Sequence, residues 1–305
     1  MRTKETFRQY IWLVNCLHGS KRISLERLKQ LWIEDDMDNG RPLSRTTFFR
    51  LKKAIDDMFG ILVECDTRNG YQYFIANPEN LEGNSTERWM LQTLTVSNFL
   101  ADSISIKDRI VLESIPAGIE YLRIIIKAMK RKKALLMGYK KFGDDTERLY
   151  TIEPYCLKVF RQRWYLLGNR QSDTKGLRFY ALDRVTDLRI ADQTFDVPDD
   201  FCVADFMKYS FGVFIGNGQK PERVVLRTYG KMTSLLRTLP KHHSQKEIAV
   251  TDTYSDFEFF VVPTFDFVQE ILKEGGDVEV REPSSLRNEM VKKLQDALAR
   301  YSVAR

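Results

Sequence analysis

The sequence predicts a multidomain α+β protein, and three observations lead to this fold class. The first 60 residues carry apolar side chains at helical spacing, and a hairpin signal follows them at Asn69-Gly70. Residues 134–200 contain short apolar runs between polar loops, a pattern typical of a small, strongly bent sheet or barrel. Strand-like and helix-like runs are mixed in residues 220–305. Because 305 residues exceed what one compact core usually holds, we expect several domains.

The N-terminal region is expected to begin with three short helices. In each of them apolar side chains recur every three or four residues, which places these side chains on one face of a helix. The three helical runs are residues 5–18, 25–35 and 45–59. Ser24 and Ser44 are placed to cap the second and third helices, and Gly60 is placed to end the third.

A β-hairpin is predicted after the third helix. Two β-like runs, "ILVECD" and "YQYFI", are joined through Arg68-Asn69-Gly70, and Asn-Gly is a strong signal for a hairpin turn. Three short helices followed by a hairpin are the outline of a winged helix-turn-helix. Residues 1–77 are therefore predicted to be a DNA-binding domain of that kind.

The third predicted helix carries the first functional signal. Residues 41–53 read "RPLSRTTFFRLKK" and contain no acidic residue. An α-helix fits the major groove of DNA, where arginine pairs with guanine and threonine contacts the thymine methyl group, while lysines and the helix N-terminus hold phosphates. The residues predicted to contact DNA are Ser44, Arg45, Thr46, Phe49, Arg50 and Lys53 on this helix, with Arg68 and Asn69 at the hairpin tip. The alternative is a solvated face on a helix that binds another protein.

A domain boundary is expected near residue 80, where "NPENLEGNS" contains Pro78 and Gly83. Residues 84–133 have helical periodicity that is broken at Pro116-Ala117-Gly118, so this region is predicted to be a helical linker that also serves dimerisation. Residues 134–200 are predicted to form a β-sheet domain, with a run at "TFDV" as its last strand, and residues 220–305 a C-terminal α+β extension.

Two further stretches, residues 121–143 and residues 155–172, are basic and contain no acidic residue. A charge run is usually a solvated face, and cations are favoured at a helix C-terminus. That account covers "KRKK" at residues 130–133, but it explains less well why a second acid-free stretch lies close by. The two stretches together favour a nucleic acid or another phosphate-bearing ligand.

The second basic stretch contains "RWYLLGNR", followed by "LRFYALDRVTDLRI", and these segments resemble a WYL domain. The domain takes its name from a triplet that stands here at Trp164, Tyr165 and Leu166. Upstream, "YTIEPYCLKVF" lies where such domains have an early strand, and downstream "LRTLPKHHSQKE" and "FEFFVVPTFDFVQEILKEGGDVEVREP" resemble the C-terminal extension of WYL regulators. With the predicted winged helix, the order of segments is similar to that of WYL-type bacterial transcription regulators, particularly a group of Bacteroidetes-like bacteria.

The resemblance implies a bent, Sm/SH3-like β-sheet that binds a nucleic-acid or nucleotide-like effector. It also implies a homodimer whose winged helices hold two half-sites of a double-stranded DNA operator. The residues expected to bind the ligand are Tyr139, Lys141, Tyr165, Arg178 and Arg184. Arginine forks bind phosphates and aromatic rings stack on bases. The alternatives are an ion pair of Arg184 with Asp183 or Asp187, and a half-buried structural role for Tyr139.

One segment departs from the family pattern. Many WYL domains have a basic residue or histidine before "EPY", whereas this chain has Tyr150 or Glu153 in that neighbourhood, so the charge of the ligand stays open. In the WYL strand itself, alternation sends Trp164 and Leu166 to one face of the sheet and Tyr165 to the other. We therefore expect Trp164 to build the core, while the flanking arginines form a charged rim.

Catalysis, cofactors and a membrane location are not expected. The four cysteines are far apart without a C-x-x-C pair, and His242-His243 has no third metal ligand at suitable spacing. The acidic "GDDTE" turn could hold Mg²⁺ or supply nuclease carboxylates, but an acidic turn between strands explains it with less effort. The start lacks the apolar stretch of a signal peptide, and no run approaches the roughly 20 apolar residues of a membrane helix. We expect a cytoplasmic, nucleoid-associated protein.

The function predicted from the sequence is sequence-specific, DNA-binding transcriptional regulation by a homodimer, with repression relieved when the WYL domain binds its effector. Two alternatives remain. The chain could be a nucleic-acid-binding accessory protein that regulates an enzyme partner, or it could be a nuclease that requires a divalent metal.

Overall fold

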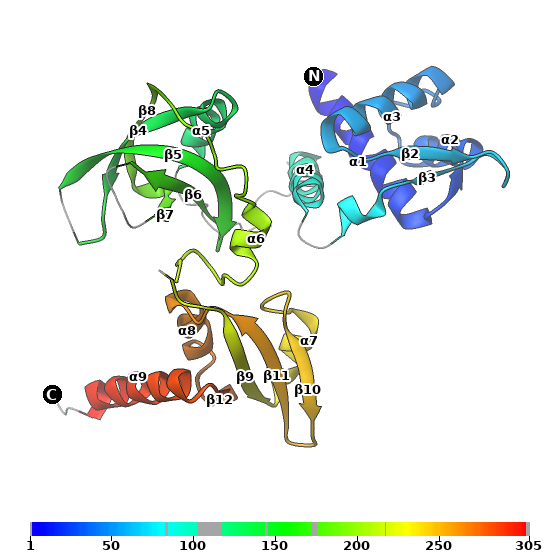
Figure 1. Cartoon of the computed structure of the whole chain (residues 1–305). Coiled ribbons are helices and arrows are strands. Elements are labelled where there is room, and N and C mark those ends of the chain that lie inside the picture. The colour runs from blue at the N-terminus through cyan, green and yellow to red at the C-terminus, as the bar shows by residue number, and fades with distance from the viewer. Residues whose placement is uncertain are drawn as a thin grey trace. The chain divides into compact units, whose positions relative to one another are not determined.

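The computed structural model describes residues 2–82, 85–102, 118–143, 146–171, 176–216 and 218–302. The chain divides into two compact units, Met1–Glu113 and Ser114–Arg305 (Figure 1). The predicted break at Pro116-Ala117 and the paired acids of "GDDTE" lie outside the described residues. Within the described ranges, no helix is both long and apolar enough to cross a membrane.

The N-terminal unit contains the three predicted helices. They are α1 (Arg2–Ser20), α2 (Leu25–Glu34) and α3 (Arg45–Phe59), and α4 (Thr86–Asp102) follows them. Both predicted N-caps are present, since Ser24 accepts a hydrogen bond from the backbone N–H of Arg27 and Ser44 from that of Thr47, the latter at 3.0 Å. The predicted end of α3 is also confirmed, because Gly60 adopts the left-handed conformation with φ of 59°.

A small antiparallel sheet of order β1-β3-β2 completes this unit. Its strands are β1 (Ile23–Ser24), β2 (Val63–Asp66) and β3 (Gln72–Ile75), and a 3₁₀ turn at Pro78–Leu81 follows. The predicted hairpin is therefore present, with Val63 opposite Ile75. β1 was not predicted, because two residues are too short for an alternation pattern. Phe48 and Leu51 of α3 are completely buried in the core that the helices and the sheet share.

The Ser44 cap gives a testable stability effect. Ser44→Ala should lower the free energy of unfolding of the N-terminal unit by about 1 kcal/mol, because the backbone N–H of Thr47 loses its acceptor. Urea unfolding of the full chain, followed by circular dichroism, measures the change. Thr46→Ala is the matched control on the same exposed turn and should stay within about 0.5 kcal/mol of the wild type. Equal stability of Ser44→Ala and the wild type would contradict the cap.

The second unit begins with α5 (Ile119–Lys130) and a five-stranded antiparallel sheet of order β7-β6-β5-β4-β8. Its strands are β4 (Lys133–Lys140), β5 (Glu147–Phe160), β6 (Arg163–Arg170), β7 (Leu177–Ala181) and β8 (Val185–Thr194), with the 3₁₀ turn η3 (Leu182–Arg184) between the last two. The helix α5 packs against β4 and β8, with Ile125 and Ala128 in the shared core (Figure 1). The prediction of a strand at "TFDV" is wrong, because the pairing of β4 with β8 ends at Thr194.

The sheet bends sharply within β5. The first half of this strand pairs with β4 and the second half with β6, and the register shifts between Pro154 and Cys156. At the bend Gly168 of β6 lies so close to Ile152 that a Cβ atom on Gly168 would overlap it. Trp164 and Leu166 both pack into the core of the sheet, as predicted from the alternation.

The C-terminal part of this unit contains a four-stranded antiparallel sheet of order β10-β11-β9-β12. Its strands are β9 (Glu222–Tyr229), β10 (Lys246–Val250), β11 (Tyr254–Val261) and β12 (Val278–Glu282). Its helices are α6 (Val203–Met207), α7 (Lys231–Thr238), α8 (Phe265–Leu272) and α9 (Ser284–Ser302), and a 3₁₀ turn lies at Gly275–Asp277. The prediction of a multidomain α+β protein is confirmed, whereas the winged-helix and Sm/SH3-like classes stay predictions.

Candidate nucleic-acid interface and ligand site

The first candidate surface is the outer face of α3, which we call the α3 face. It consists of the exposed residues Arg45, Thr46, Phe49, Arg50 and Lys53. These side chains point outward because the opposite face of the helix, with Phe48, Leu51 and Ile55 at spacings of three and four residues, fills the core. The guanidinium carbon of Arg45 lies 5.7 Å from the centre of the Phe49 ring, so the first arginine is partly held by an aromatic neighbour.

The α3 face is positively charged and uncompensated. Within the described ranges no carboxylate forms an ion pair with Arg45, Arg50 or Lys53. At the N-terminus of α3, the Ser44 hydroxyl accepts a hydrogen bond from the backbone N–H of Thr47. The first-turn N–H groups of Arg45 and Thr46 point out of the helix end. A helix end with this polarity, next to arginines, suits a phosphate.

The two residues predicted at the hairpin tip, Arg68 and Asn69, have different roles in the structure. The carboxylate of Asp66 accepts the backbone N–H groups of Arg68 and Asn69 at 3.1 and 3.3 Å, and the side-chain amide of Asn69 at 2.8 Å. That amide and the ion pair with Arg22 lower the pKa of Asp66. Asn69 therefore holds the turn, whereas the Arg68 side chain is exposed. Tyr71, which sequence reasoning missed, is also well exposed beside the tip.

The second candidate surface is an arginine–aromatic cluster of Arg163, Arg184 and Phe142 on the five-stranded sheet. The guanidinium of Arg184 lies 4.0 Å from the centre of the Phe142 ring, and that of Arg163 lies 6.0 Å from it. The Phe142 side chain is 75% exposed, so a large part of its ring faces solvent between two cations. Nothing in the sequence pointed to Phe142, and Arg163 was predicted only as one of the flanking arginines of a charged rim and not as a ligand residue.

The partners of the two arginines differ. Arg163 forms an ion pair with Asp183, and this hydrogen bond raises the pKa of the Arg163 side chain. Arg184 donates from Nε to the backbone carbonyl of Lys140 at 3.0 Å. The ion pair of Arg184 with Asp183 or Asp187 that we considered is not formed in the described part of the chain, because Asp183 pairs with Arg163 and Asp187 pairs with Arg189 at 2.9 Å. The outer nitrogens of Arg184 are thus available for a ligand.

Tyr139 supports this cluster from below. The residue is only 5% exposed, and its hydroxyl accepts the backbone N–H of Ala181 at 3.2 Å. Burial raises the pKa of its phenol. Because the guanidinium of Arg184 lies 4.9 Å from its ring centre, Tyr139 positions that arginine. A ring so deeply buried cannot stack on a base, so the burial of Tyr139 argues against the predicted direct contact with a ligand.

The other predicted ligand residues lie on different parts of the sheet. Tyr165 is half-buried beside Arg163, with its ring centre 6.4 Å from that of Phe179, and burial raises the pKa of its hydroxyl. Lys141 is exposed next to Phe142. Arg178 is half-buried in β7.

Both residues at the departure from the family pattern contact neighbouring side chains of the sheet. Tyr150 is buried, and the guanidinium of Arg170 lies 4.4 Å from its ring centre. The carboxylate of Glu153 accepts hydrogen bonds from Asn169 at 2.9 Å and Gln171 at 3.0 Å.

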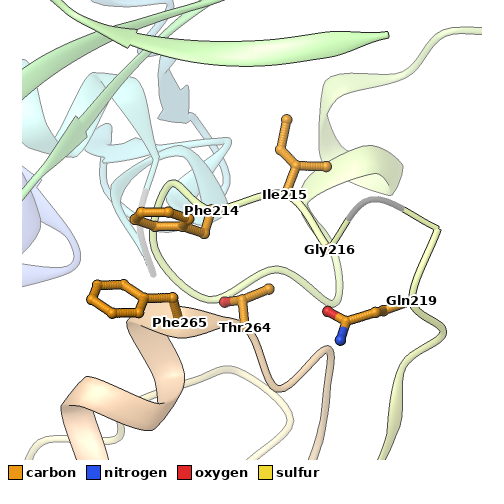
Figure 2. A pocket seen from close by; sticks show the side chains of 6 residues that line it. All are labelled: Phe214, Ile215, Gly216, Gln219, Thr264 and Phe265. Carbon is orange, nitrogen blue, oxygen red and sulfur yellow. The ribbon is translucent and has the colours of Figure 1, made fainter. Parts of the chain in front are cut away.

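A separate pocket of about 370 Å³ lies in the C-terminal part (Figure 2). The rings of Phe214 and Phe265 form one wall, with their centres 4.9 Å apart. The remaining lining residues are Ile215, Gly216, Gln219 and Thr264. None of these residues is charged, so the pocket suits an apolar group rather than a phosphate.

The rings of the adjacent histidines His242 and His243 lie against each other. Their ring centres lie 4.1 Å apart, and the described residues contain no group of three His, Cys, Asp or Glu side chains that could hold a metal ion. His242 instead accepts the backbone N–H of Ser244 on Nδ1 at 3.2 Å, as a neutral ring does. Burial lowers the pKa of His242 to about 4.

This shift predicts a loss of stability on acidification. The unfolded chain takes up a proton on His242 near its ordinary pKa, but the folded chain does so only near pH 4, so stability falls as the pH drops from about 6.5 toward 4. His242→Asn keeps an acceptor for Ser244 and should flatten this part of the curve. Urea unfolding at several pH values measures it. His18→Asn replaces an exposed histidine of the other unit and is the control, which should keep the wild-type dependence; a wild-type curve for His242→Asn would contradict the assignment.

Comparisons with known proteins give two domain matches. The WYL domain model matches residues 120–190, and the WCX domain model matches residues 220–298. The first match contains the arginine–aromatic cluster, and the second contains the pocket residues Thr264 and Phe265. The chain is thus a WYL-domain protein with a WCX domain after the WYL domain. The resemblance drawn from Trp164, Tyr165, Leu166 and the surrounding segments is confirmed.

Similarity to solved structures is distant. One is the proteasome accessory factor B/C (PafBC) of Arthrobacter aurescens, with 17% identity and a TM-score of 0.38; the match covers 95% of this chain and 46% of that one. This chain thus spans about half the length of PafBC. Another is a crystal structure of a CRISPR Cas-related protein, with 13% identity, a TM-score of 0.41, and coverage of 88% and 76%. A comparison with curated proteins finds no match.

Proposed function

We propose that this protein is a sequence-specific, DNA-binding transcriptional regulator in which residues 1–77 act as a winged helix-turn-helix. The observation that carries the proposal is the α3 face, an exposed and acid-free helix surface with two arginines in its first two turns. In this reading Arg45 and Arg50 pair with guanine edges in the major groove, and Lys53 and the α3 N-terminus hold phosphates.

The hairpin and a second copy complete the proposed DNA complex. Arg68 reaches the neighbouring backbone or minor groove, and Asn69 keeps the turn in shape through Asp66. A homodimer with residues 84–133 as a linker and dimerisation region presents two such domains to two half-sites. We propose residues 134–200 as the sensing domain and residues 220–305 as the C-terminal extension.

The proposed effector is a nucleic-acid or nucleotide-like molecule bound at the arginine–aromatic cluster. Phe142 offers an exposed ring for a base, and Arg184 offers an unpaired guanidinium edge for a phosphate. Lys141 and Tyr165 border the cluster, and Arg178 lies further along the sheet. Binding of the effector is proposed to relieve repression. We assign no catalytic role and no cofactor to the chain.

Contacts at the turn between β5 and β6 support a route from the cluster to the WCX domain. Both turn residues, Arg161 and Gln162, have positive φ values of 48° and 64°, as a two-residue hairpin loop requires. The Arg161 guanidinium pairs with Glu270 of α8 at 2.7 Å, and Phe160 packs against the WCX core. Arg163 of the cluster directly follows this turn, so a ligand that moves Arg163 acts on the WCX contacts.

Selection from a pool of random duplexes tests the proposed function. The full chain should enrich one sequence that occurs as two half-sites, about 10 base pairs or one helical turn apart, or a multiple of that spacing. Recovery of bound DNA without an enriched sequence would overturn the proposal. That result would favour an accessory protein that binds nucleic acid through phosphates alone.

A further inference from the structure

The pocket at the start of α8 holds two exposed aromatic rings that none of the proposed contacts uses. Phe214 is 50% exposed and Phe265 is 52% exposed, and their ring centres lie 4.9 Å apart (Figure 2). Removing apolar surface of this kind from water is favourable, roughly in proportion to the area covered. A ligand that covers both rings therefore gains hydrophobic free energy at this place.

Buried polar groups hold the backbone that carries these rings. The carboxylate of Asp266, a buried residue of α8, accepts the backbone N–H groups of Val213 at 2.6 Å and of Phe214 at 3.0 Å. The buried Thr264 donates from its hydroxyl to the carbonyl of Phe211 at 3.3 Å. Because the loop is fixed before a ligand arrives, little conformational entropy is lost when a ligand binds.

Two glycines let the loop lie close to its neighbours. Gly212 has a φ of 75°, in the left-handed region, and a Cβ atom there would overlap the Asp266 carboxylate. A Cβ atom on Gly216 would lie 2.6 Å from a methyl carbon of Val262. The carbonyl of Gly212 also accepts a hydrogen bond from Lys158 of β5. The loop that forms the pocket wall is thus held by the WYL sheet as well as by α8.

The lining of the pocket decides which ligand fits. None of its residues carries a charge, so a charged ligand would lose hydration without gaining a partner. Figure 2 shows the two rings on one side of Thr264 and the Gln219 side chain on the other. Rings attract a further ring through edge or offset contacts, and an amide supplies both a hydrogen-bond donor and an acceptor. The volume of about 370 Å³ is in the range of small-molecule sites.

We propose that this pocket binds a small, uncharged aromatic molecule, with its ring against Phe214 and Phe265 and its polar edge on Gln219. The site shares no residue with the arginine–aromatic cluster, and its chemistry differs, because the cluster offers cations and the pocket offers none. The inference goes beyond the proposed function and depends neither on operator recognition by α3 nor on the effector of the cluster.

The test is isothermal titration calorimetry of the full chain at pH 7 with indole compounds of similar size and different charge. Indole-3-acetamide is uncharged, indole-3-acetate is an anion and tryptamine is a cation. The uncharged compound should bind at least about 10-fold more tightly than either charged one, because only the charged groups lose hydration without a partner. The double variant F214A/F265A should bind indole-3-acetamide about 10-fold or more weakly, since both rings are removed.

Two further variants make the test specific to the pocket. The control I248A/V250A removes two exposed apolar side chains of β10 in the same unit and should bind indole-3-acetamide as the wild type does. Gln219→Glu places a carboxylate in the lining and should shift the preference toward tryptamine.

Three results would overturn the proposal. They are absence of indole-3-acetamide binding by the wild type, equal affinity of the wild type for all the indole compounds, and equal losses in F214A/F265A and I248A/V250A.

Discussion

Replacing Arg45 and Arg50 together with alanine should remove the preference of the full chain for its operator. Each arginine that pairs with a guanine contributes about 1–3 kcal/mol of discrimination, so the double variant should lose at least about 30-fold in specific affinity. Alanine preserves the helix, because it has the highest helix propensity and both side chains lie outside the core. Anisotropy with operator and scrambled duplexes measures the effect.

Two comparisons show whether this loss is specific to base recognition. Lys53→Ala should weaken binding to both duplexes equally and reduce the salt slope by about 1, as expected for a single phosphate contact. Lys246→Ala, an exposed cation in β10 of the other unit, should change neither affinity. An R45A/R50A protein that still prefers the operator would show that α3 does not read the sequence.

Replacing Arg184 with alanine should weaken effector binding by about 10- to 100-fold, the range expected for loss of a charge-assisted hydrogen bond. Operator binding in the absence of effector should remain unchanged, because Arg184 lies in the second unit and donates a hydrogen bond to the Lys140 carbonyl of the same unit. The measurement is the oligonucleotide concentration that releases half of the bound operator.

The matched control is Arg189→Ala, which removes an exposed arginine of β8 that pairs with Asp187. This variant should respond to the effector as the wild type does. Arg184→Lys should fall between the wild type and alanine, because lysine keeps the charge and loses the planar fork. If Arg184→Ala released the operator at the same oligonucleotide concentration as the wild type, the arginine–aromatic cluster would not be the sensing site.

Local signals were enough to predict most elements of the fold. The caps at Ser24 and Ser44 and the helix end at Gly60 depend on chemistry within a few residues, and all three are present. The two-residue strand β1, the strand β12 and the helix α7 were not predicted, because they are short and are held by partners distant in sequence. The overall arrangement of segments was accessible only through the resemblance to WYL regulators.

The ligand site illustrates what the sequence could not predict. Arg184 was identified, but its neighbours Phe142 and Arg163 come from the turn after β4 and from the start of β6, and only the folded sheet brings them together. Tyr139 was expected at the ligand, yet its position in the middle of a bent sheet buries it. The alternation pattern predicts the face of the sheet on which Tyr139 lies, but it does not predict how deeply that face is buried.

The central claim is that this chain recognises a DNA sequence. The most direct test is anisotropy binding of the full chain to duplex DNA from its own upstream region, with a scrambled duplex of equal composition, over a series of salt concentrations. The account predicts a preference of about 10³-fold or more for the native duplex. Equal affinity for both duplexes, with a steep salt dependence, would mean phosphate contact without sequence readout and would contradict it.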